Sequence, residues 1–138
     1  MYKILVVEDD KDMCKMTAQT LKKKGYKIAK AYSGEEAIKK IISMNYDLAI
    51  VDFILPDMDG IEVIQKIRNI GLSISVIMIS AYGNDLVKSK AKKLGVGQFL
   101  DKPFNLSKLL KVVKNTTSKN CMRSGNCLTP SNKRAELK

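Results

Sequence analysis

Apolar runs with the length of buried strands alternate along the chain with segments of helical period. Between the runs, apolar residues recur every three or four positions, as they do in helices that pack one face on a sheet. Gly25, Gly71 and Gly95 stand where three of these helices should end, and Ser33 or Gly34 can start another. The pattern predicts strands at 4–7, 28–31, 48–51, 76–79 and 96–100, and helices around 13–21, 37–42, 61–67, 86–94 and 106–113.

Strict alternation of strands and helices predicts an α/β fold. Such units connect by right-handed crossovers into a parallel sheet, and strands that are apolar throughout must be covered by helices on both faces. The sequence therefore predicts a doubly wound sheet of five parallel strands with five helices. In these folds ligands bind beyond the carboxyl ends of the strands, so the residues that follow each strand are the first candidates for chemistry.

The length of 138 residues suits one domain. Apolar periodicity stops near Thr117, and the remaining residues are rich in Ser, Asn, Lys and Gly. We expect a folded domain at 1–117 and a basic, disordered tail at 118–138. The tail has no pattern of a helix-turn-helix or winged output domain, which favours a domain that acts without a DNA-binding unit.

The net charge of +11 raises the question of nucleic acid. The charge divides into +7 for residues 1–117 and +4 for the tail, and it is mostly lysine scattered over several helices. With three arginines and no tryptophan, the chain lacks the aromatic and arginine stripe of a groove binder. The sequence predicts solvated helix faces, with no direct binding of nucleic acid.

Location follows from the apolar runs and the cysteines. No apolar segment has the length of a membrane span, and the first one meets Glu8 too soon for a signal peptide. Cys14 lies in a helical pattern, whereas Cys121 and Cys127 lie in the tail with no zinc-motif spacing. We expect a cytoplasmic protein with reduced thiols and no membrane contact.

Polar residues follow four of the predicted strands. They are the acidic run 8–10, then Asp52, then Ser80, then Lys102 before Pro103. Carboxylates that converge on one sheet edge repel one another unless a cation or a lysine compensates them. Because the chain has no histidine, the ligands are oxygens, and Mg²⁺ is the cation that such a set favours.

With a metal in place, Asp52 can attack phosphorus in line and form an aspartyl phosphate. Lys102 would supply an ammonium group and Ser80 a hydroxyl donor for the charge of the transferring group. Each residue also has a structural interpretation. The acidic run could be a turn or helix cap, Ser80 could satisfy backbone, and Lys102 could be a surface lysine. Their joint spacing over five β-α units favours the chemical interpretation.

At these residues the chain resembles the receiver domain of two-component response regulators, over about 2–117. Tyr82 and Gly83, with the general pattern, are most similar to single-domain receivers of the chemotaxis and sporulation-relay type. The resemblance implies the flavodoxin-like strand order 2-1-3-4-5. The matching stretches are KILVVEDD (3–10), DLAIVDFILPDMDG (47–60), IMISAYG (77–83) and FLDKPF (99–104).

The resemblance also implies roles for individual residues. Asp52 would be the phosphoacceptor, Asp9 a direct Mg²⁺ ligand, Glu8 a ligand through water and Ile54 a ligand through its backbone carbonyl. In a separate group, Ser80 and Lys102 would contact the phosphoryl group, Lys102-Pro103 would be a cis peptide, and Phe99 would be the aromatic switch. Ile54 and Tyr82 occupy positions that tune hydrolysis, and an apolar Ile54 predicts slow loss of the phosphoryl group.

By this resemblance the protein is a signalling switch or phosphorelay carrier and not an enzyme that turns over a substrate. Its donor would be a sensor histidine kinase or a histidine phosphotransferase, and its output would go to a downstream protein through the fourth helix, fifth strand and fifth helix. Three alternatives stay open. They are a phosphatase of the haloacid-dehalogenase type, which would need Asp where Ile54 stands, an interaction domain with a vestigial site, and a fragment of a transcription factor.

Overall fold

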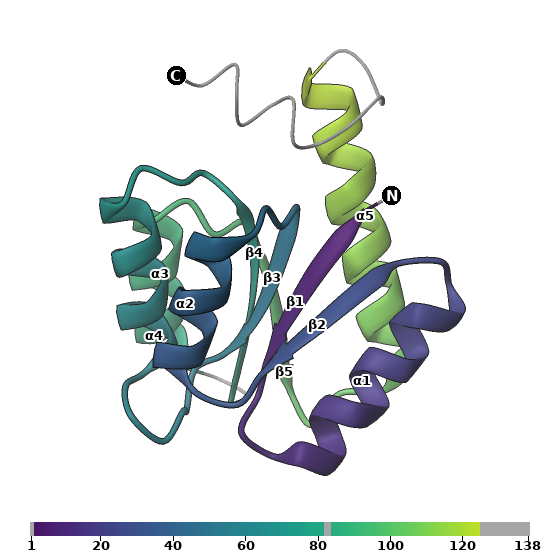
Figure 1. Ribbon diagram of the computed structural model, residues 1–138, viewed down its shortest axis with the longest axis horizontal. Helices are drawn as coiled ribbons and strands as arrows, with labels where there is room; N and C mark the ends of the chain where they lie inside the picture. The colour runs from purple at the N-terminus through teal and green to yellow at the C-terminus, as the bar shows by residue number, and fades with distance from the viewer. Residues whose placement is uncertain (1, 82–83, 125–138) are drawn as a thin grey trace.

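The computed structural model describes residues 2–81 and 84–124, with side chains described up to Thr117 (Figure 1). Strands and helices alternate strictly along this part of the chain, as the apolar pattern predicted. In order they are β1 (Lys3–Val7), α1 (Lys11–Lys23), β2 (Lys27–Ala31), α2 (Gly34–Ser43), β3 (Leu48–Asp52), α3 (Gly60–Asn69), β4 (Ser75–Ala81), α4 (Asp85–Lys93), β5 (Gln98–Lys102) and α5 (Leu106–Ser124).

The five strands form one parallel sheet in the order β2-β1-β3-β4-β5, which confirms the predicted fold. The strand starts lie within one residue of the predictions except that of β5, which begins at Gln98 instead of Val96. Val96 is buried in the turn before the strand, where its N–H donates to the carbonyl of Ala91 at 3.1 Å. An apolar residue here fills the core without joining a strand, so its hydropathy moved the predicted boundary.

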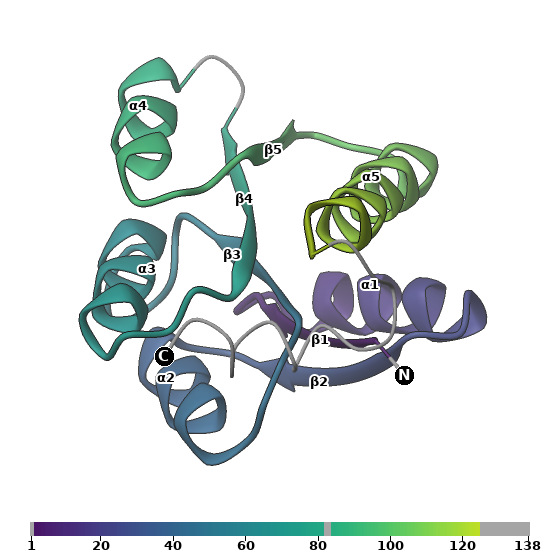
Figure 2. The same ribbon diagram turned by 90° about the horizontal axis from the view of Figure 1, so that it is seen from above.

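Helices cover both faces of the sheet (Figure 2). Side chains alternate along β1: Leu5 and Val7 pack with the cluster under α2, α3 and α4, while Ile4 and Val6 pack with the cluster under α1 and α5. The central strand β3 is buried at every position. Burying one such aliphatic side chain contributes about 1.5–3 kcal/mol, so the central strands are the most strongly held part of the frame.

The helix ends confirm the sequence signals. Ser33 caps α2, and its hydroxyl accepts the N–H of Glu36 at 3.1 Å. Gly25, Gly71 and Gly95 follow helix ends with φ of +94°, +98° and +87°, a conformation that glycine adopts without strain. Helix α5 continues to Ser124, so the boundary expected at 117 falls inside it. The rest of the predicted tail lies outside the described residues.

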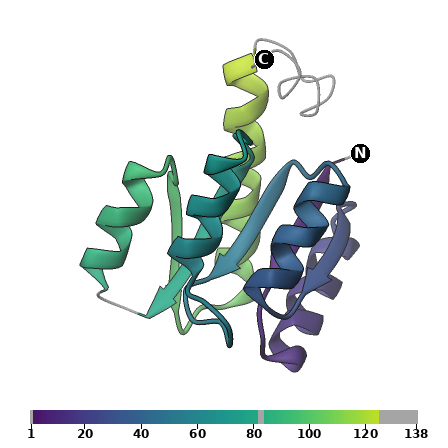
Figure 3. The same ribbon diagram turned by 60° about the vertical axis from the view of Figure 1, so that its left-hand side comes forward.

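The strand order places the topological switch point of the sheet between β1 and β3. The chain leaves β1 through α1 toward β2 on one side, whereas β3 pairs with β1 on the other side. At such a switch point the connections diverge and leave space beyond the strand ends. Figure 3 shows β3 and β4 ending at the same lower edge of the sheet, and the polar residues of the sequence analysis lie there.

Candidate functional site

Three carboxylates meet at the carboxyl ends of β1 and β3. Glu8 and Asp9 follow β1, Asp52 is the last residue of β3, and one oxygen of each lies within 4.8 Å of the others. Glu8 and Asp52 are only 4% and 2% exposed, while Asp9 is exposed. The sheet thus brings together acids that are more than forty residues apart in sequence, as expected.

This crowding has an electrostatic cost that falls on Glu8. Burial, then the hydrogen bond to Asp52 and the repulsion from its charge, raise the pKa of Glu8 to about 8. The site therefore favours a proton on Glu8 when no cation is bound. A divalent ion would supply the missing positive charge in place of that proton.

Lys102, at the end of β5, provides the one cation that the described residues place against these acids. Its Nζ lies 2.6 Å from Oδ2 of Asp52 and 3.7 Å from Oε2 of Glu8. Burial lowers the pKa of Lys102, but the hydrogen bond and charge of Asp52 and the charge of Glu8 outweigh burial, so that the net pKa is raised. Lys102 therefore stays charged beside Asp52.

The backbone fixes the direction of the Asp52 carboxylate. Its Oδ1 accepts the N–H of Ile54 at 3.2 Å, and the N–H of Phe53 donates to the carbonyl of Ile79 at 2.8 Å. Gly60 then passes so close that a Cβ there would lie 2.7 Å from the carbonyl oxygen of Asp52. The turn after β3 needs glycine at this point, and the side chain of Ile54 is left 67% exposed at the rim.

Ser80 offers an unused donor next to the acids. It follows Ile79, the register partner of Asp52, and its side chain is 2% exposed. Among the described residues its hydroxyl has no hydrogen-bond partner. A buried hydroxyl without a partner costs about 1–3 kcal/mol, so this group is suited to bind an oxygen of an incoming ligand.

Other predicted residues divide between structure and site. Asp10 belongs to the acidic run but caps α1, because its Oδ1 accepts the N–H groups of Asp12 and Met13 at 3.1 Å. The Lys102-Pro103 peptide is cis, as predicted. Phe99 is half-buried against the cluster under α2, α3 and α4, and Tyr82 lies outside the described residues.

Sequence reasoning missed two polar contacts that frame the site. The carboxylate of Asp57 accepts the N–H groups of Gly34 and Glu35, both at 2.9 Å, and these bonds lower the pKa of Asp57. Lys88 of α4 pairs with Asp101 of β5 at 2.8 Å. The partners lie 22, 23 and 13 residues apart, so no local spacing rule could have found them.

The residues at this edge fit a magnesium ion. Oxygen ligands only, two of them buried carboxylates with an exposed third, suit a hard cation that keeps part of its water shell. The unpartnered Ser80 hydroxyl and the charged Lys102 remain available for an anionic group. Glu8, Asp9 and Asp52 are the side chains that would hold the ion.

Fold and site together define a class: a doubly wound α/β domain that carries, at the switch point of its sheet, an acidic pocket in which one lysine pairs with two buried carboxylates. Residues 4–114 match the response regulator receiver domain family, and the chain belongs to that family. It is thus a two-component response regulator receiver with an acidic pocket formed by Glu8, Asp9 and Asp52. No helix among the described residues is long and apolar enough to span a membrane.

Similar proteins come from several bacteria. The regulatory protein VanRc of Enterococcus gallinarum is 36% identical over 112 residues, which are 81% of this chain and 48% of VanRc. A two-component response regulator from Clostridium difficile has a TM-score of 0.78 and 37% identity, covering 83% of this chain and 94% of its own. Response regulator TrrA from Thermotoga maritima, solved in complex with Mg²⁺-BeF, has a TM-score of 0.74 and 34% identity, with 83% and 98% covered. The chain spans about half the length of the first curated relatives.

Proposed function

We propose that this domain accepts a phosphoryl group on Asp52 from a phosphohistidine of a sensor histidine kinase or histidine phosphotransferase. The observation that carries the proposal is Asp52 itself. A carboxylate 2% exposed, aligned by the N–H of Ile54 and paired with Lys102 at 2.6 Å, is a preorganised nucleophile. Membership of the receiver family and a relative bound to Mg²⁺-BeF support the same role.

In the proposed step, a lone pair of an Asp52 carboxylate oxygen forms the new O–P bond. The P–N bond to the donor imidazole breaks, and the imidazole keeps the electron pair and takes a proton from water. Bound Mg²⁺ would neutralise charge on the transferring group. Lys102 and Ser80 would hold that group by an ammonium contact and a donated hydrogen bond, and little further chemistry is needed from the chain.

The output proposed for the phosphorylated state is a change on the surface of α4, β5 and α5. Ser80 would turn toward the oxygens of the new phosphoryl group, and the ring of Phe99 would move into the space that Ser80 leaves. Helix α4 is suited to respond, because it buries only Val87 and Ala91 and is tied to β5 by the Lys88–Asp101 pair. A downstream protein, or the next carrier of a phosphorelay, would recognise the changed surface.

The decisive experiment is intact mass spectrometry after incubation with Mg²⁺ and acetyl phosphate. We expect wild type to gain one phosphoryl group, and the gain to vanish with Asp52→Asn or with excess chelator. Glu62→Gln, an exposed carboxylate on α3 changed to its amide, is the matched control and should be labelled like wild type. Labelling that persists in Asp52→Asn contradicts the proposal.

The phosphatase alternative has no support at position 54, where Ile54 stands in place of a second acid. It makes a separate prediction, multiple turnover of a small phosphate ester such as p-nitrophenyl phosphate. We expect a single stoichiometric labelling of Asp52 instead, followed by slow hydrolysis. Sustained release of p-nitrophenol that is abolished by Asp52→Asn would contradict the proposed switch and show that the protein is a phosphatase.

A further inference from the structure

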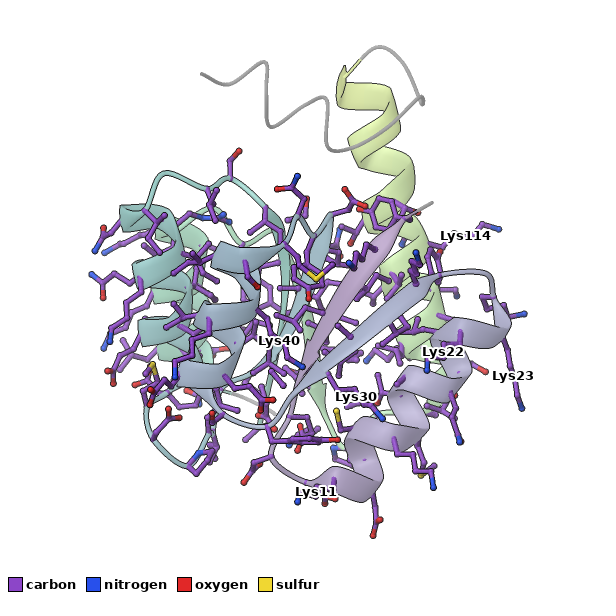
Figure 4. The ribbon with its side chains drawn as sticks, in the orientation of Figure 1. Lys11, Lys22, Lys23, Lys30, Lys40 and Lys114 are labelled. Atoms are coloured by element: carbon purple, nitrogen blue, oxygen red, sulfur yellow. The ribbon has the colours of Figure 1, made fainter. Side chains whose placement is uncertain are left out.

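Two segments that are adjacent in the fold carry lysines with no acidic residue among them. Residues 13–34 contain six lysines and residues 102–117 contain four, and neither range holds Asp or Glu. The first range covers most of α1 and all of β2, and the second covers most of α5, which lies beside α1 on the same face of the sheet (Figure 2). Figure 4 shows labelled Lys22, Lys23 and Lys114 on one side of the molecule.

Between these elements lies a groove of about 630 Å³. Its rim carries Lys24, at the end of α1, and Lys111 and Lys114, from α5, while half-buried Tyr26 and Leu110 give it an apolar component. Helix α5 starts after the carboxyl end of β5 and runs back along the sheet. The groove therefore lies toward the end of the sheet where the strands begin, away from Asp52.

The rim lysines have no partner within the described part of the chain. None of Lys24, Lys111 and Lys114 forms an ion pair or side-chain hydrogen bond there, in contrast to Lys88 and Lys102, which pair with acids. All three are exposed. Like charges gathered around one hollow attract an anionic partner and repel a basic one.

Charge selects among the occupants of the groove. A second copy of the same face would set lysines against lysines, and residues 118–138 of this chain are themselves basic, with a net charge of +4. A single-stranded nucleic acid would need free ring faces for stacking, but the ring of Tyr26 is half-buried and packs edge-to-face on Tyr2 at 6.0 Å. An acidic protein segment that also carries an apolar side chain matches both the rim and the floor.

We propose that the groove between α1 and α5 binds an acidic segment of a partner protein. Its carboxylates would pair with Lys24, Lys111 and Lys114, and one apolar side chain would lie against Tyr26 and Leu110. The contact uses no residue of the phosphoacceptor site. It is therefore expected to form equally well with wild type and with Asp52→Asn, which separates this proposal from the proposed phosphotransfer.

The test is fluorescence anisotropy with the labelled peptide Asp-Glu-Leu-Glu-Asp-Leu-Glu-Asp on the whole chain. We expect the variant Lys24→Glu/Lys111→Glu/Lys114→Glu to bind the peptide at least about tenfold more weakly than wild type. The matched control Lys39→Glu/Lys66→Glu/Lys92→Glu has the same net charge, with its changes on the opposite face in α2, α3 and α4, and should keep most of the affinity. A peptide with Ser for both Leu residues should bind several-fold more weakly.

Three results would overturn the proposal: no binding by wild type, equal loss in both triple variants, or equal binding of the Leu and Ser peptides. Tighter binding of a labelled oligothymidylate of the same charge, lost in the groove variant alone, would assign the groove to nucleic acid instead. Circular dichroism and the milder Lys→Gln triple variant guard against a folding defect. Amide shifts in a nitrogen-15 spectrum should move at Tyr26 and Leu110 and stay fixed at Asp52.

Discussion

At the scale of single residues, the site is a balance between two buried carboxylates and one ammonium. Lys102 contacts both Asp52 and Glu8, yet one positive charge cannot neutralise two acids together. Burial raises the pKa of Glu8 most, and the hydrogen bond to Asp52 and the repulsion from its charge add to the rise, which Lys102 only partly offsets. A folded-state pKa of about 8, above the ordinary glutamate pKa of 4.5, means that folding favours the protonated acid. This contribution to stability is complete below the lower value and is lost as the pH rises through the higher one.

Glu8→Gln should therefore stabilise the metal-free protein at high pH. Glutamine has nearly the same shape but carries no charge, so it avoids the cost of ionising a buried acid. We expect a gain of about 1–3 kcal/mol near pH 8 and little change near pH 5. Urea unfolding in excess chelator measures both. With saturating Mg²⁺ the order should reverse at pH 8, and a destabilised Glu8→Gln protein in chelator at pH 8 would contradict the charge balance.

We expect Ile54 to set a second property at this scale, the lifetime of the proposed phosphorylated state. Its exposed side chain sits at the rim and offers no hydrogen bond to an attacking water. Ile54→Asn should speed dephosphorylation by roughly 2- to 10-fold, since an amide can orient that water, while stability changes little at so exposed a position. Loss of phosphoryl mass over time measures the rate, and equal or slower loss in the variant would count against the idea.

Residue types in sequence predicted the pocket because burial of charge is so costly. An Asp that ends a wholly apolar strand needs a partner, and the parallel topology supplies Lys102 from fifty residues away. The same reasoning could not separate Asp10, a helix cap, from Glu8 and Asp9. All three follow one strand, and only the direction of the chain at the start of α1 decides which side chain faces the pocket.

At the scale of elements, the turn between β3 and α3 controls where Asp52 points. Gly60 opens α3, and its N–H donates to the carbonyl of Phe53 at 2.7 Å, which draws the two ends of the turn together. A side chain there meets backbone, which cannot rotate away as a flexible side chain can. The position of the Asp52 carboxylate thus depends on a residue eight positions further along.

Gly60→Ala tests this dependence. The added Cβ would lie 2.7 Å from the carbonyl oxygen of Asp52 and 3.0 Å from Cα of Phe53. Either the end of β3 or the start of α3 must therefore shift. We expect a loss of about 1–3 kcal/mol in urea unfolding and slower labelling by acetyl phosphate. Gly97→Ala is the matched control, because a Cβ there meets nothing within 4 Å. Equal stability of the two variants would show that the turn has room to adjust.

Strands and helices were predictable from the sequence wherever the segment itself carries the apolar or capping pattern of its structure. Apolar runs and capping residues such as Ser33 and Gly71 placed strands and helices within a few residues. Contacts such as Lys88–Asp101 and Asp57 with α2 were beyond reach, because they depend on how separate units dock. The start of β5 was also predicted wrongly, because Val96 is an apolar residue that is buried in the core but lies before the strand.

At the scale of the whole molecule, charge is unevenly distributed. The chain carries +11, and residues 13–34 and 102–117, which include most of α1 and of α5, contribute ten lysines and no acid. Self-repulsion of this kind opposes the compact state and is screened by salt over about 10 Å at 0.1 M. Packing of the apolar core must outweigh this repulsion for the chain to stay folded.

Stability should therefore rise with ionic strength. We expect NaCl between about 0.02 and 0.2 M to raise the Tm by roughly 1–4 °C, equivalent to about 0.5–1 kcal/mol in a domain of this size. The Lys24→Gln/Lys111→Gln/Lys114→Gln variant, with three charges fewer, should melt higher at low salt and gain less from added salt. Thermal unfolding followed by circular dichroism measures both, and a Tm that falls with salt would contradict this account.

The carboxylate of Asp57 helps to order the acidic pocket before any ligand binds. By accepting the N–H groups of Gly34 and Glu35, it anchors the loop after β3 to the start of α2, while Asp59 anchors the far end of that loop to α3. A loop held at both ends has already lost its conformational freedom during folding. A cation that binds beside Asp52 thus meets a loop that is already ordered. Little of the free energy of cation binding is then lost to ordering the chain.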